Sequence, residues 1–165
     1  MFNLDFSSKI TNKIIIKKCS SKLTIERLIA NINNNNLNCV QVFNPEFVIN
    51  RVHLIAAYIN AVNAFEEKNN ISQKLNLELL LYSAMTRQIE KAIKRIGAND
   101  NKNFILFSTV EDYEKIRVYI DKEEEFSKSI KEQLDTAKKY NIIADKKNLD
   151  YLIIQALAIS IIKEG

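Results

Sequence analysis

The chain has 165 residues, of which 47% are hydrophobic and 27% charged, a size and composition that fit one globular domain with a sizeable core. The formal net charge of +4 permits contact with nucleic acid or an anionic surface without establishing either. Two Gly and one Pro exclude long low-complexity linkers.

The first part of the chain alternates strand and helix signals. Ile10–Cys19 is rich in isoleucine and predicts a strand, and Val40–Phe43, stopped by Asn44-Pro45, predicts a second one. Between them we expect Thr24 to cap a short helix that runs through Ile32.

The middle of the chain is more apolar. From Asn50 a helical pattern of about five turns is apolar on two sides, which is typical of a largely buried helix. The run LELLLY at Leu77–Tyr82 has the length of a strand and predicts one that is covered on both faces. We then expect Thr86 to cap a helix that ends at Gly97, and Asn103–Ser108 to form another buried strand.

The last third is predicted to be helical. Two mainly amphipathic helices are expected at Glu111–Ile120 and Glu124–Tyr140, with the acidic run 121–125 as a solvated junction. The terminal helix, Leu149–Ile162, carries apolar residues on every side but is shorter than the ~18–20 residues that span a bilayer. The fold class is therefore α/β, a single layered domain over residues 1–165 with a mixed central sheet flanked by helices.

No residue pattern indicates a catalytic, metal or cofactor site. Cys19 and Cys39 lack paired spacing, and with the single histidine, His53, they do not make up the roughly four ligands of a zinc site. The two glycines, Gly97 and Gly165, do not form a phosphate-binding loop. The N-terminus has no secretory signal pattern, so we expect a cytoplasmic protein with no cofactor, no small-molecule substrate and no membrane contact.

The segment YSAMTRQIEKAIKRIG, residues 82–97, is the most informative for binding. Four residues at helical spacing predict its buried stripe: Ile89, Ala92, Ile93 and Ile96. Arg87, Lys91 and Arg95 stand four residues apart and line one ridge, with Lys94 beside them. Together with Gln88 and the amides of a helix N-terminus, this ridge suits a phosphate or a nucleotide edge. A solvated basic face is the alternative interpretation.

Four stretches between Arg51 and Gly97 carry a family pattern: HLIAA at 53–57, AFEEKNNIS at 64–72, ELLLYSA at 78–84 and RQIEKAI at 87–93. Together they resemble the small subunit of the archaeal and eukaryotic KEOPS (EKC) complex, the CGI family. One departure is Met85, since family members usually have Gly in the turn before the Arg-Gln pair, and a side chain there makes positive φ costly. The segment Lys68–Asn70, where relatives often carry Gly, is a milder change because Asn tolerates the left-handed conformation.

The resemblance implies a non-catalytic subunit. It would bind and stimulate the kinase-like ATPase subunit of KEOPS and hold the single-stranded CCA end of tRNA, so that other subunits can transfer threonylcarbamoyl to an adenosine beside the anticodon. His53 would stack on a base and Arg51 would neutralise a phosphate. The residues expected at this tRNA site are Arg51, His53, Arg87, Gln88, Lys91, Lys94 and Arg95.

The terminal helix is the expected binding site for the kinase-like partner, because an exposed row of Ile and Leu is the kind of patch that marks an interface. The expected partner-facing residues are Ile153, Ile154, Leu157 and Ile161. The expected inward residues are Leu152, Ala156 and Ile159. Three alternatives stay open: a fully internal terminal helix, a homodimer that pairs through it, and a small RNA-processing or RNA-modifying enzyme that uses His53 with Arg87 and Lys91.

Overall fold

One antiparallel sheet organises the computed structural model, which describes the backbone of residues 13–163 and the side chains of residues 13–160. Its strands are β1 (Ile14–Ser21), β2 (Val40–Phe43), β3 (Phe104–Thr109) and β4 (Ile120–Glu125). They lie in the order β2-β3-β1-β4, and all three neighbouring pairs are antiparallel. The outer strands, β2 and β4, are therefore the two edges of the sheet.

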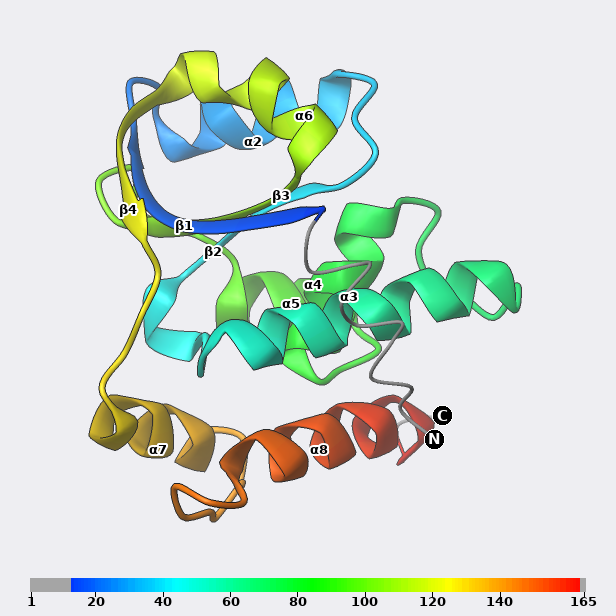
Figure 1. The fold of residues 1–165 in the computed structure, drawn as a ribbon. Coiled ribbons are helices and arrows are strands. Elements are labelled where there is room, and N and C mark those ends of the chain that lie inside the picture. The colour runs from blue at the N-terminus through cyan, green and yellow to red at the C-terminus, as the bar shows by residue number, and fades with distance from the viewer. Residues whose placement is uncertain (1–12, 164–165) are drawn as a thin grey trace.

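Helices cover both faces of this sheet. They are α2 (Ile25–Asn34), α3 (Arg51–Glu66), α4 (Leu75–Ala84), α5 (Ile89–Ile96), α6 (Val110–Ile116), α7 (Ile130–Lys138) and α8 (Leu149–Lys163), with short 3-10 turns η1 (Pro45–Phe47) and η2 (Arg117–Tyr119). Helices α2 and α6 lie on one face, α3 to α5 lie on the other, and α7 and α8 lie beyond α3 (Figure 1). The α/β class is confirmed, but the prediction of a mixed sheet is wrong, because every strand pair in the described residues is antiparallel. Within the described residues, the helices are too short or too polar to span a bilayer.

The strands separate two hydrophobic clusters because successive side chains of a strand point to opposite faces. In β3, Phe104 and Leu106 belong to the cluster under α2 and α6, whereas Ile105 and Phe107 belong to the cluster under α3 to α5. The second cluster is the larger and also takes in residues of α8. The sheet is thus covered on both faces, as the sequence predicts.

Local signals placed several elements correctly. Strand β2 has the predicted bounds, Val40–Phe43. Thr24 caps α2 by accepting a hydrogen bond from the N–H of Arg27 at 3.4 Å. Asn50 caps α3 by accepting one from the N–H of His53 at 3.0 Å. Side-chain caps satisfy N–H groups that the first helical turn leaves unpaired, which is why such residues mark helix starts.

The prediction of a strand at Leu77–Tyr82 is wrong, because this segment lies inside helix α4. Residues 75–84 contain Leu, Glu and Ala, which favour helices, and no β-branched residue, which strands favour. The apolar run reflects burial on several sides, since α4 packs against α3, α5, β2 and α8.

Strand β4 was not predicted. It lies between the two segments that were predicted as helices, and both of these form shorter helices than expected. Instead of one helix over Glu111–Ile120, the chain forms α6 and then η2, and the helix predicted at Glu124–Tyr140 is α7, which begins at Ile130 after a capping box of Ser129 and Glu132. The acidic residues of β4 pair across strands, with Lys17 Nζ 2.8 Å from Glu123 and Lys18 Nζ 3.5 Å from Glu124. Opposite charges on neighbouring strands support an otherwise polar edge strand.

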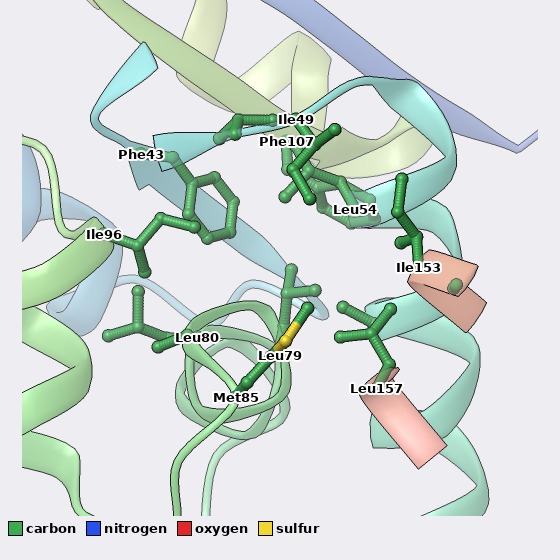
Figure 2. Close-up of a cluster of buried hydrophobic side chains, with 14 of the residues drawn as sticks. Phe43, Ile49, Leu54, Leu79, Leu80, Met85, Ile96, Phe107, Ile153 and Leu157 are labelled. Carbon is green, nitrogen blue, oxygen red and sulfur yellow. The ribbon is translucent and has the colours of Figure 1, made fainter. Parts of the chain in front are cut away.

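Three helices end in a left-handed residue that is not glycine: Lys68 (φ 58°), Met85 (φ 55°) and Asn141 (φ 59°). After α4, the N–H groups of Met85 and Thr86 bond to the carbonyls of Tyr82 and Leu81 at 3.0 and 3.2 Å, which is a Schellman motif. Met85 therefore adopts the conformation for which Gly would be better suited. Its side chain is buried and reaches the cluster drawn with Leu79 and Leu157 in Figure 2.

We predict that Lys68→Gly stabilises the protein. The side chain of Lys68 is exposed, so its removal costs little, while the positive φ costs a residue with a Cβ about 1 kcal/mol. Lys68→Ala, which keeps the Cβ, is the matched control and should stay close to wild type. Urea unfolding of the three proteins measures the difference, and equal stability of the Gly and Ala variants would contradict a left-handed residue 68.

Candidate functional site

Helix α5 begins later than its sequence predicts. Its N-cap is Gln88, which makes no side-chain capping bond, and the first helical residue is Ile89. Thr86, the predicted cap, is buried, and its hydroxyl accepts a hydrogen bond from the N–H of Gln88 at 3.3 Å in the turn before the helix. Thr86 is unsuited to the cap because it also closes the Schellman motif of α4.

The polar surface of this segment is brought together as expected. Five exposed residues form what we call the basic face of α5: Arg87, Gln88, Lys91, Lys94 and Arg95. The predicted buried stripe is only half correct, because Ala92 and Ile96 are buried while Ile89 and Ile93 are exposed, the latter by 52%. The short helix α5 therefore exposes two aliphatic side chains, Ile89 and Ile93, in addition to its basic face.

Aromatic rings lie under the cations at one end of the basic face. The guanidinium of Arg95 lies 5.8 Å from the centroid of the Tyr140 ring and donates to the carbonyl of Ala84 at 2.8 Å. Lys139 Nζ lies 4.6 Å from the centroid of the Phe47 ring, and the hydroxyl of Tyr140 donates to the Phe47 carbonyl. Sequence reasoning missed Phe47, Lys139 and Tyr140, since these residues lie far from α5 along the chain and no local pattern links them to it.

His53 does not belong to this surface. It is fully buried, its Nδ1 accepts from the N–H of Ile49 at 3.1 Å, and its Nε2 lies 2.8 Å from the carbonyl oxygen of Ser83, to which it therefore donates. Burial lowers the pKa of His53 from 6.5 to about 4, so the ring is neutral near pH 7. The predicted stacking of His53 on a base is wrong. The enzyme alternative, in which His53 works with Arg87 and Lys91, loses its proposed base for the same reason.

Arg51 is held at the sheet instead of at α5. Its Nη1 donates to the carbonyl of Ile16 in β1 at 3.0 Å and lies 3.8 Å from a carboxylate oxygen of Glu125 in β4. Helix α5 packs against α4 and η1. The structure thus groups five of the seven predicted tRNA-site residues and separates Arg51 and His53 from them.

The predicted division of the terminal helix is wrong at Ile153, Leu157 and Ile159, whereas Leu152 and Ala156 pack against the core as expected. Ile153 and Leu157, expected to face a partner, are fully buried and point toward Leu54, Leu79 and Met85 (Figure 2). Ile159, expected to face inward, is 45% exposed. Leu152, Ala156 and Ile154 are half-buried, and the side chain of Ile161 lies outside the described residues. An apolar pattern on every side of a helix cannot tell which side the rest of the chain will cover.

The uncovered side of α8 is still apolar. Apart from Asp150 in the first turn, the exposed residues of α8 among the described side chains are Tyr151, Gln155, Ala158 and Ile159, which we call the outer face of α8. Tyr151 is 62% exposed, and its hydroxyl accepts a hydrogen bond from Gln155 Nε2 at 2.7 Å. The loop before the helix adds Ile143, another largely exposed aliphatic residue.

The remaining metal-ligating residue types form no metal site in the part of the chain that the structure describes. Both cysteines are buried, and burial raises the pKa of the Cys19 thiol to about 12. No group of three or more His, Cys, Asp or Glu side chains in residues 13–160 could hold a metal ion.

Residues 17–160 match the protein family described as "Kinase binding protein CGI-121". This match covers most of the chain, including all of the sheet except the first three residues of β1, and both surfaces defined above. The chain belongs to this family.

A curated relative carries a more specific name. The chain is 33% identical over 109 residues to "KEOPS complex subunit Cgi121" of Pyrococcus abyssi (strain GE5 / Orsay). The matched region covers 66% of this chain and 60% of that relative.

We predict that His53 stays neutral far below its ordinary pKa. Because the pKa of His53 is lowered in the folded state, the unfolded chain binds the extra proton at a higher pH than the folded chain does. The contribution of neutral His53 to the free energy of unfolding is therefore fully present above pH 6.5 and is lost as the pH falls toward about 4. The loss should be on the order of 3 kcal/mol. NMR titration of the ring is unambiguous because the chain has one histidine. A folded-state pKa near 6.5 would contradict the buried geometry.

Proposed function

We propose that this protein is the non-catalytic, kinase-binding subunit of a cytoplasmic KEOPS-type complex. The outer face of α8 would bind and stimulate the kinase-like ATPase subunit. The basic face of α5 would hold the single-stranded CCA end of tRNA, and other subunits would carry out the threonylcarbamoyl transfer. The observation that carries the proposal is an apolar helix face left uncovered in a chain whose family is described as kinase-binding.

The partner side of the proposal is supported by the chemistry of the outer face of α8. Tyr151 and Ile159 combine a large apolar surface with a position next to a fully packed core. Interfaces between proteins are enriched in aromatic and large aliphatic residues whose burial on binding excludes water. The opposite side of α8 is anchored in the core by the buried side chains of Ile153 and Leu157. Binding of a partner would therefore cost little conformational entropy of the helix.

The RNA side is supported by the basic face of α5. Lys91, Lys94 and Arg95 are exposed cations suited to phosphates, and the carboxamide of Gln88 can pair with a base edge. Ile89 and Ile93 are exposed on the same short helix and offer an apolar surface. Single-stranded RNA presents phosphates, base edges and apolar base faces together, whereas duplex RNA hides the last two. This combination favours an unpaired end.

For the kinase-like partner we predict that Ile159→Glu weakens binding at least about 30-fold, the equivalent of roughly 2 kcal/mol. The charge would enter the interface, while the fold is unaffected because the side chain is exposed. Isothermal titration of this chain with its own organism's kinase-like subunit gives the dissociation constant.

The matched control is Val118→Glu, the same change at a site that is 60% exposed in η2, on the other side of the molecule. It should bind as wild type does. Unchanged affinity of Ile159→Glu would refute the proposed surface. A wild-type chain that forms a stable dimer and ignores the kinase-like subunit would favour self-pairing through α8 instead.

For RNA we predict that the double substitution Lys91→Gln, Lys94→Gln weakens tRNA binding and flattens its salt dependence. Each phosphate contact to a single strand contributes about 0.7 to the slope of log affinity against log salt, so the slope should fall by about 1.4. Fluorescence anisotropy at several salt concentrations measures this. The control pair, Lys146→Gln with Lys147→Gln, removes the same charge from the exposed loop before α8.

A second comparison tests the CCA end itself. Transfer RNA without its CCA end should bind more weakly than intact tRNA, and a changed anticodon should matter less. Equal affinity for trimmed and intact tRNA would show that the RNA site is wrongly assigned, and would leave the kinase-binding proposal standing.

A further inference from the structure

Ser20 of β1 carries a buried hydroxyl that has no hydrogen-bond partner among the described residues. The residue is 9% exposed, and it forms part of the lining of a pocket at the end of the sheet. Buried polar groups are almost always paired, so an orphaned hydroxyl needs an explanation, and an absent ligand is one.

Polar side chains from β1, from β4 and from the loop before β3 line the pocket beside this hydroxyl. Ser20 pairs with Lys122 of β4, and Lys18 lies two residues before it on β1. These three side chains lie on the same face of the sheet, because strand residues alternate between faces. On the other flank, Lys102 and Asn103 lead into β3 and line the same pocket. The pocket thus presents three ammonium groups, one hydroxyl and one carboxamide.

The charges of the pocket do not cancel. Of its two carboxylates, Glu123 is bonded to Lys17 and to the hydroxyl of Tyr113, and Glu124 lies 3.5 Å from Lys18 at an exposed position. Neither Lys102 nor Lys122 forms an ion pair with any residue that the structure describes. Two cations beside the orphaned hydroxyl therefore remain available to an anion.

We propose that this pocket binds a phosphate group. Lys102 and Lys122 supply charge, and the Ser20 hydroxyl and Asn103 amide donate directional hydrogen bonds to phosphate oxygens, which accept several at once. The Ser20 hydroxyl is shielded from solvent, so phosphate reaches it only when a neighbouring side chain moves. This site is separate from the basic face of α5 and stands whether or not the proposed function is correct.

The experiment is a two-dimensional NMR titration of the full chain with inorganic phosphate. We expect saturable shifts of the amides of Ser20, Asn103 and Lys122. Lys102→Gln with Lys122→Gln should weaken binding at least about fivefold, whereas Lys146→Gln with Lys147→Gln, which removes the same net charge elsewhere, should leave it unchanged. Ser20→Ala should also weaken binding while raising the melting temperature, since it removes an unpaired buried hydroxyl.

Two further ligands identify the source of the phosphate. If a single-stranded RNA without terminal phosphate shifts the same amides and competes with inorganic phosphate, the site takes a backbone phosphodiester. If a nucleoside monophosphate does so and this RNA does not, the site takes a free or terminal phosphate. The proposal is overturned if none of these ligands gives saturable shifts, if both lysine pairs weaken binding equally, or if Ser20→Ala binds phosphate as wild type does.

Discussion

Helix α8 is apolar around its whole circumference, but the rest of the chain covers only the side that carries Leu149, Ile153 and Leu157. The sheet is already covered on this face by α3 to α5, so α8 can pack only against the outside of that layer (Figure 1). A helix in an outermost layer has one side left to solvent. When that side carries Tyr151 and Ile159 instead of charged residues, burial against another molecule removes apolar surface from water, which is the dominant favourable term in association.

Polar contacts tie the two proposed surfaces to the same framework. The Asn50 side chain caps α3 and also donates to Gln133 and Asp150, which joins α3 to α7 and α8. One turn further on, the His53 ring donates to the Ser83 carbonyl near the end of α4 and packs edge-to-face with the Tyr140 ring, with the ring centroids 5.3 Å apart. Tyr140 in turn lies under Arg95 of the basic face. The histidine that sequence reasoning placed at the RNA site therefore acts behind it, as part of its support.

Local sequence signals identified the elements whose formation is decided locally. Thr24 caps a helix where the pattern places it, the helical pattern predicted from Asn50 is α3, and Asn44-Pro45 ends β2. Tertiary surroundings decided the rest. LELLLY is apolar because α4 is buried on several sides, and DKEEE forms an edge strand because Lys17 and Lys18 lie opposite. The sequence of each segment alone does not show which distant residues will lie beside it. The side of α8 that faces inward was undetermined for the same reason, and a lone His53 gave no sign of how deeply it is buried.

The central claim is that the outer face of α8 is where this chain meets its kinase-like partner. Site-specific photo-crosslinking tests it most directly, with a benzophenone amino acid in place of Ile159 in one preparation and of Val118 in another. Both positions are exposed and lie on different sides of the molecule. The account predicts a crosslink to the kinase-like subunit from position 159 and none from position 118. Crosslinks from 118 alone, or from 159 only to a second copy of this chain, would contradict it.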